Sequence, residues 1–272
     1  MSPWHAVLLG VVQGIGEFAP ISSSGHLIVL PWLLGWQEDQ GLSFDVALHF
    51  GTLLALLIYF GPDLWRMLRD YFSRWRLPGG FWPAQKQYML PLIFGCFPAA
   101  LAGFLMEDFV ESKLRSPGLV AALMAGMGLV LYSADRLGRK TKPLAETRAL
   151  DWLTVGVSQA LALFPGVSRS GITITAGLAV GMRREAAAQF SFLLSIPIVA
   201  GASAMEAKKL LNHGIPADER SAFAIGILTA AVFGYICIKF LLAYLRTRSV
   251  NVFVWYRLAF AAVVAVTLLL RA

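Results

Sequence analysis

Long runs of apolar residues dominate this sequence and are separated by short polar segments. Six of the runs are each about as long as the ~20 residues that cross the hydrocarbon core of a bilayer as an α-helix. The pattern therefore predicts an all-α polytopic membrane protein with six transmembrane helices, formed as a single membrane domain over residues 1–272. The six runs are residues 43–60, 88–106, 117–134, 187–206, 222–243 and 252–270.

Two further apolar segments are interrupted by proline, glycine and hydroxyl residues, and they resemble one another. Residues 10–26 and 156–172 align without a gap and are identical at seven of seventeen positions. Doubled, broken segments of this kind build the central site of many membrane proteins with inverted repeats. We therefore predict two halves of inverted topology, about 1–134 and 150–272, whose broken helices meet near the middle of the bilayer.

The charges in the loops predict how the chain crosses the membrane. Basic residues are concentrated in the loops 61–87 and 135–151, whereas the loop 107–116 is richer in acidic residues. The positive-inside rule places the first two loops in the cytoplasm and the third outside. Counting the crossings from there puts Arg183 and Arg184 on the cytoplasmic side as well.

Both broken segments are then expected to be re-entrant hairpins. Residues 152–182 would begin and end on the inner side, and residues 4–36 would enter from the outside and return there. The alternative is two ordinary hairpins packed through small residues. The ionisable side chains of the breaks favour the re-entrant interpretation, because such groups are costly inside a membrane and usually serve a function.

Composition agrees with the membrane setting and argues against other classes. Hydrophobic residues make up 57% of the chain and charged residues 14%, and the mean hydropathy is +0.66, which is more apolar than a soluble domain of this length. The net charge of +7 lies in short loops rather than on one soluble face, so no nucleic-acid partner is predicted. Cys96 and Cys237 fall inside predicted spans and are expected to pack as small hydrophobic residues.

The first break combines a carboxylate, an amide, three hydroxyls and an imidazole. Gln13 and Glu17 are four residues apart and share one face of a helix, which Pro20 is expected to end. Capping or an interior hydrogen bond explains each polar residue taken singly. Their combination within fourteen membrane-embedded residues indicates a functional site. These polar residues are Gln13, Glu17, Ser22, Ser23, Ser24 and His26.

The second break carries an arginine between two serines. Burying the guanidinium of Arg169 inside the membrane costs about 3 kcal/mol on mild insertion scales. A guanidinium suits a bidentate oxyanion such as phosphate. The start of the next helix offers main-chain amides to the same anion. We therefore predict that Arg169, with hydroxyls of Ser168, Ser170 and Thr173, binds a phosphate or diphosphate group.

These two breaks resemble the signature motifs of the bacterial undecaprenyl-diphosphatases, the bacitracin-resistance family. The resemblance is carried by residues 13–18, 20–26 and 165–173 and extends over essentially the whole chain. It implies removal of the terminal phosphate from undecaprenyl diphosphate, which regenerates the carrier lipid of cell-wall synthesis. It also implies a multi-pass protein of the bacterial cytoplasmic (inner) membrane, with a pocket open to the outer, periplasmic side, and it suggests a homodimer.

The resemblance and the chemistry together assign roles to the breaks. In that family the first motif is glutamate or glutamine followed four residues later by glutamate, and this chain has Gln13 there. Glu17, helped by Gln13, is predicted to hold a divalent cation against the lipid diphosphate, Mg²⁺ or alternatively Ca²⁺. Ser22 and Ser24 are predicted to help bind the phosphates.

The nucleophile is left open between three groups. We favour Ser23 as the attacking hydroxyl, with His26 as its acid–base partner. Attack by His26 itself or by an activated water is the alternative. His5, His49 and His213 lie outside the breaks and are predicted to be structural or interfacial.

A different class of function fits the same architecture. Inverted repeats with broken helices also build secondary transporters, so the chain could instead flip a phosphorylated polyprenyl lipid. A channel or scaffold without chemistry would leave Glu17 and Arg169 unexplained. Hydroxyls beside a histidine and a metal-capable acid favour the enzyme.

Overall fold

The computed structural model describes residues 2–36, 41–73, 86–213 and 219–271. Within these ranges the side chains of residues 41–42, 70–73, 86–93, 107–108, 111, 206–207 and 209–213 are not described. The described part of the chain is built from α-helices and two short 3₁₀ segments and contains no β-strand, only an isolated bridge between Lys142 and Met182. The predicted all-α polytopic class is confirmed.

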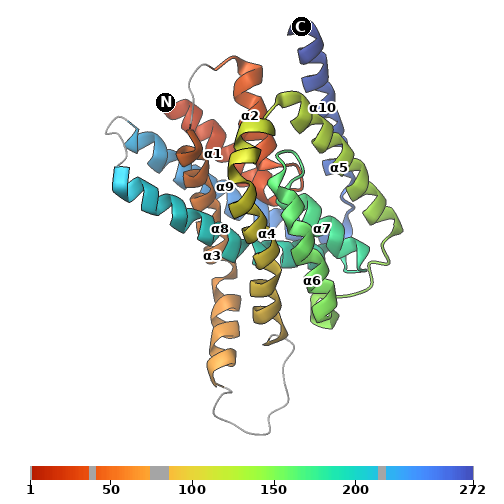
Figure 1. Ribbon diagram of the computed structural model, residues 1–272. Coiled ribbons are helices and arrows are strands. Elements are labelled where there is room, and N and C mark those ends of the chain that lie inside the picture. The colour runs from red at the N-terminus through yellow and green to blue at the C-terminus, as the bar shows by residue number, and fades with distance from the viewer. Residues whose placement is uncertain (1, 37–40, 74–85, 214–218, 272) are drawn as a thin grey trace.

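Ten α-helices follow one another in the described part of the chain, and the order of long and short helices in the first five returns in the second five (Figure 1). A short broken pair is followed in each case by three longer helices. The first five are α1 (Pro3–Phe18), α2 (Ser23–Leu34), α3 (Gly41–Ser73), α4 (Lys86–Lys113) and α5 (Pro117–Leu137). After the 3₁₀ turn η2 (Leu144–Glu146) come α6 (Ala149–Ser158) with the 3₁₀ segment η3 (Gln159–Leu163), α7 (Arg169–Ala179), α8 (Arg184–His213), α9 (Arg220–Thr247) and α10 (Asn251–Arg271).

Five of the six predicted spans are helices long and apolar enough to cross a membrane, judged over the described residues. They lie in α3, α5, α8, α9 and α10. The sixth predicted span, 88–106, lies in α4, whose described apolar section is the shorter stretch Phe94–Met106.

Proline and serine set the geometry of both breaks. Ala19 and Phe164 precede Pro20 and Pro165 and are extended, with ψ of 138° and 115°, because a proline disfavours helical backbone in the residue before it. The next helix starts in each case after a serine N-cap with positive φ, 73° at Ser22 and 75° at Ser168. Their hydroxyls accept hydrogen bonds from the main-chain N–H groups three residues on, at 3.2 and 3.0 Å. A serine therefore caps the second helix of both broken pairs.

Each broken pair begins and ends at the same end of the helix bundle. At the mouth of the first pair the rings of His5 and Trp36 stack with centroids 3.8 Å apart. At the mouth of the second pair the N–H of Arg183 donates to the carbonyl of Lys142 at 2.8 Å. In Figure 1, α1 starts at the upper end of the view and α6 at the lower end. The two hairpins open toward opposite ends of the bundle, as two re-entrant hairpins of inverted halves would. Their re-entrant character and the bounds about 1–134 and 150–272 stay predictions.

Ion pairs connect segments that the charge pattern of the loops places on the same side of the membrane. Asp135 and Arg184 form a two-point ion pair, with distances of 2.6 and 3.0 Å, near the predicted cytoplasmic loops. At the other end, Asp45 at the start of α3 lies 3.5 Å from Arg115 in the α4–α5 connection. Contacts between distant parts of the chain therefore agree with the predicted order of crossings.

Cysteine labelling in sealed vesicles tests this topology. Single cysteines at positions 142 and 183, in a chain with Cys96 and Cys237 replaced by alanine, should react from one face. A cysteine at position 115 should react only from the other face. Labelling of 142 and 183 from opposite faces would contradict the re-entrant hairpin.

Close contact between the two halves holds the hairpins in place. A Cβ on Gly10 of α1 would lie 2.9 Å from the carbonyl oxygen of Gly226 in α9. At the matching position of the second half, a Cβ on Gly156 would lie 2.8 Å from the carbonyl oxygen of Gly95 in α4. Glycine at both positions therefore lets the first helix of each hairpin pack directly on a helix of the other half.

Candidate functional site

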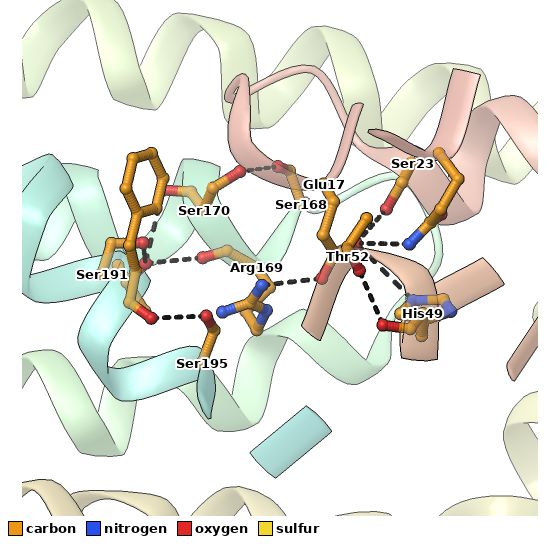
Figure 2. Close-up of polar contacts among 12 residues, drawn as sticks. Glu17, Ser23, His49, Thr52, Ser168, Arg169, Ser170, Ser191 and Ser195 are labelled. Atoms are coloured by element: carbon orange, nitrogen blue, oxygen red, sulfur yellow. Dashed lines mark hydrogen bonds and ion pairs between the residues drawn. The ribbon is translucent and has the colours of Figure 1, made fainter. Parts of the chain in front are cut away.

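The carboxylate of Glu17 is the centre of a polar cluster between the two breaks (Figure 2). Its side chain is only 5% exposed at the last turn of α1. Oε1 pairs with Nη2 of Arg169 at 2.7 Å. Oε2 accepts hydrogen bonds from Oγ of Ser23 at 2.6 Å and Nε2 of Gln13 at 3.1 Å, and it lies 3.6 Å from Nε2 of His49. The structure thus brings together the predicted acid, amide, nucleophile and guanidinium.

Ser23 and Arg169 hold equivalent positions in the two breaks. Each is the first residue of its helix, α2 or α7, directly after the serine cap. The hydroxyl of Ser170 also crosses from one break to the other and donates to the carbonyl of Ala19 at 3.1 Å. Two helix N-termini, which favour anions, therefore flank one carboxylate and one guanidinium.

Two buried polar atoms of this cluster have no hydrogen-bond partner among the described residues. One is Nη1 of Arg169 and the other is Oε1 of Gln13. A carboxylate only accepts hydrogen bonds, so Gln13 must turn its NH₂ toward Glu17 and leave its oxygen free. An unpaired N–H of a buried guanidinium suits an anionic oxygen, and a free amide oxygen suits a cation or a donor.

The hydroxyls predicted to bind phosphate make bonds within the breaks. Ser22 and Ser168 cap α2 and α7 and lie 3.4 and 3.2 Å from the hydroxyls of Ser24 and Ser170. Thr173 donates to the carbonyl of Arg169 at 2.7 Å. These contacts fix the shape of the breaks. A second role as phosphate ligands stays a prediction for all five residues, Ser22, Ser24, Ser168, Ser170 and Thr173.

The predicted partnership of Ser23 with His26 is not what the structure shows. Both ring nitrogens of His26 are engaged elsewhere, Nδ1 with the carbonyl of Ser22 and Nε2 with the hydroxyl of Tyr256, each at 2.7 Å. The ring also packs on Phe260, with centroids 4.3 Å apart. Ser23 donates to Glu17 instead. Nδ1 of His26 faces a carbonyl and carries a proton, so a direct transfer from Ser23 would require Nε2 to leave Tyr256.

His49, which we expected to be structural, belongs to the cluster. Its Nδ1 lies 2.8 Å from the carbonyl of Asp45, one turn earlier in α3, so this nitrogen carries the proton. Nε2 faces Glu17, and the His49 side chain, at 29% exposure, is the most exposed member of the cluster. A sequence signal did exist: Asp45, His49 and Thr52 recur at helical spacing within an otherwise apolar span.

The donor set fits a divalent cation only if the substrate supplies part of the shell. No cluster of three or more His, Cys, Asp or Glu side chains is placed to hold a metal within the described residues. The free oxygen of Gln13 and the carboxylate of Glu17 are nevertheless the hard oxygen ligands that Mg²⁺ and Ca²⁺ prefer. Such an ion would take these two protein ligands and complete its shell with phosphate oxygens and water.

Comparison with known proteins places this chain in one family. The family model described as "Bacitracin resistance protein BacA" matches residues 6–263. A protein of Moorella thermoacetica named undecaprenyl-diphosphatase is 48% identical over 273 residues, covering 100% of both chains. Proteins of the same name from Geobacter metallireducens and Thermomicrobium roseum are 46% and 45% identical and cover 95% and 97% of both chains.

Proposed function

Because this chain belongs to the bacitracin resistance protein BacA family, we propose that it hydrolyses undecaprenyl diphosphate to undecaprenyl phosphate and inorganic phosphate. It is an undecaprenyl-diphosphate phosphatase that recycles the carrier lipid for cell-wall synthesis. One observation supports this most strongly: a hydroxyl and a guanidinium from two different breaks meet on the carboxylate of Glu17. The names of its relatives do not favour the alternative transporter.

Arg169 is the residue that binds the diphosphate in this proposal. Its Nη2 is held by Glu17, which fixes the plane of the guanidinium. Its Nη1 is buried without a partner among the described residues and is free to donate to a phosphate oxygen. The N-termini of α2 and α7 add favourable dipoles on either side.

Ser23 is the proposed nucleophile and Glu17 its base. The Ser23 hydroxyl already donates to Oε2 at 2.6 Å, within the range for proton transfer. As Oγ forms its bond to the terminal phosphorus, the proton passes to Glu17. The bond from phosphorus to the bridging oxygen breaks, and its electron pair leaves with undecaprenyl phosphate. Glu17 then releases this proton to solvent and becomes a carboxylate again. Water attacks the phosphorus of the phosphoserine and gives a proton to Glu17, which passes it to Oγ of Ser23 as the P–Oγ bond breaks. Inorganic phosphate departs and Ser23 is regenerated.

A divalent cation, Mg²⁺ or alternatively Ca²⁺, is part of the proposal. Glu17 and Oε1 of Gln13 would hold it, with the diphosphate and water as further ligands. A bound cation of this kind neutralises charge on phosphate oxygens. Arg169 and the two helix N-termini stabilise the same negative charge on the phosphate oxygens.

The chain is a multi-pass membrane protein, and its orientation is a further part of the proposal. We place it in the bacterial cytoplasmic membrane, with the loops 61–87 and 135–151 inside. His49, the exposed member of the cluster, lies one turn from Asp45, which pairs with Arg115 in the loop 107–116 that we place outside. The site would then open to the periplasm. A homodimer also stays a proposal.

Phosphate release tests the activity directly. The purified, detergent-solubilised chain should release inorganic phosphate from a polyprenyl diphosphate, and an excess of chelator should stop the release. In proteoliposomes, movement of the lipid diphosphate between leaflets without any phosphate release would instead establish the transporter.

Replacing Ser23 by alanine tests the nucleophile. The change should lower turnover by more than about a hundredfold, the scale expected when a covalent step is lost. Acid quenching of the wild type during turnover should trap phosphate on a peptide that contains Ser23. Ser133→Ala, which removes an exposed hydroxyl of α5, is the control. If Ser23→Ala turned over at the wild-type rate, Ser23 would not be the nucleophile, and water or His26 would take that role.

A further inference from the structure

Arg257 of α10 is a second arginine at the centre of the molecule, and neither broken segment contains it. Its side chain is fully buried, with 0% exposure. Among the described residues no carboxylate pairs with it; its guanidinium donates to main-chain carbonyls instead. The acceptors and distances are Met124 at 2.8 Å, Gly166 at 2.8 Å, Pro20 at 3.1 Å, Val167 at 3.2 and 3.3 Å, and Leu123 at 3.5 Å.

These carbonyls belong to three separate segments. Pro20 lies in the first break, Gly166 and Val167 lie in the second, and the other two acceptors lie in α5. Backbone in the breaks cannot form regular helical hydrogen bonds, and unsatisfied carbonyls are costly in the interior of a membrane protein. The planar fork of a guanidinium carries five N–H donors in fixed directions. Arg257 therefore satisfies non-helical backbone of both breaks at once.

The bonded carbonyls are close in sequence to the residues of the site. Pro20 is three residues from Glu17 and three from Ser23, and Gly166 is three residues before Arg169. One rigid group thus fixes the segment that carries the acid and the nucleophile relative to the segment that carries the guanidinium of the site. Gly171 allows this close approach, because a Cβ there would lie 3.1 Å from Nη1 of Arg257.

We propose that Arg257 is a positioning residue for the reaction: it holds the two breaks in register so that Glu17, Ser23 and Arg169 align on one phosphate. This inference rests on the proposed hydrolysis. It predicts that the shape of the guanidinium matters as well as its charge. A lysine ammonium is a single point of donation and cannot reach carbonyls on both sides of the fork.

Kinetics of Arg257→Lys test the positioning role. We expect kcat to fall by more than about tenfold, because small misplacements of reacting groups are costly. KM for the lipid diphosphate should change by less than about threefold, because Arg169 is still present to bind the phosphate. Arg271→Lys is the matched control: Arg271 is on the same helix and donates to the carbonyls of Trp32 and Leu33 at 2.9 and 3.0 Å, but it is exposed and distant from the breaks. Its kcat should stay at the wild-type value.

Chemical rescue separates positioning from folding. Arg257→Ala leaves a space with the shape of a guanidinium. Added guanidinium, at concentrations well below denaturing ones, should raise the kcat of this variant at least about tenfold, and the increase should level off as the space fills. The amount of folded protein, measured by size-exclusion chromatography, should stay constant during the rescue. Wild-type kcat in Arg257→Lys, or a loss that follows the folded fraction and is not rescued, would overturn the inference. Absence of phosphate release by the wild-type chain would instead reject the proposed hydrolysis.

Discussion

Replacing Glu17 by glutamine is expected to abolish hydrolysis at ordinary Mg²⁺ concentrations. The substitution removes the acceptor for the Ser23 proton and the charge that faces Arg169. It also turns a carboxylate ligand into a weaker amide ligand. Raised Mg²⁺ should therefore restore metal binding but only a small part of the activity, because an amide cannot take the Ser23 proton. The measurement is the rate of phosphate release against Mg²⁺ concentration, with folded yield measured in parallel.

Loss of charge pairing alone would give a different pattern. Arg169 would then be left uncompensated, and Glu17→Gln should lose folded yield and thermal stability without any rescue by metal. Gln13→Glu is the companion variant, because it restores the acidic form of the motif beside Glu17 and should lower the Mg²⁺ concentration needed for half-maximal rate. Identical Mg²⁺ dependence in the wild type and both variants would remove Glu17 and Gln13 from the metal site.

Arg169→Lys is expected to lower kcat/KM by more than about tenfold while the protein still inserts and folds. Lysine keeps the positive charge near Glu17 but lacks a second nitrogen to replace the unpartnered Nη1. Its single nitrogen therefore cannot replace the two nitrogens of the planar guanidinium, one bonded to Glu17 and the other facing a phosphate oxygen. Arg246→Lys is the control, because Arg246 forms a similar ion pair with Glu185 at 2.6 Å on an exposed face. Near-normal turnover of Arg169→Lys would remove Arg169 from the site.

The sequence predicted the elements of the fold because their causes are local. Proline at positions 20 and 165 interrupts apolar segments, and serine two or three residues later caps the next helix. Charges in the loops then indicate which ends of the spans face the cytoplasm. Glu17 and Arg169 were identifiable for a related reason, since ionised groups stand out in apolar sequence.

The contacts within the site could not be read from spacing. His26 is three residues from Ser23, yet its ring turns to Tyr256, which is 230 positions away in sequence. His49 reaches Glu17 only because α3 packs beside α1. Which side chains meet across helices depends on the rotation of each helix about its axis, and no local pattern determines that rotation.

Arg257 shows the same limit most clearly. In the sequence it is one basic residue within the apolar run 252–270. Its partners are main-chain carbonyls, which every residue possesses, so side-chain chemistry gave no indication of them. Only the fold shows that two breaks and α5 bring their free carbonyls to one point.

The proposed mechanism requires that the two breaks form one catalytic site through Glu17 and Arg169. A double-mutant cycle measures this coupling: kcat/KM for phosphate release is compared in the wild type, Glu17→Gln, Arg169→Lys and the double variant, all at one raised Mg²⁺ concentration at which Glu17→Gln still releases measurable phosphate. Residues that act as a unit give losses that do not add. We predict that the double variant is at most a fewfold worse than the worse single variant. Losses that multiply in full would show that the two residues act independently and would contradict a single shared site.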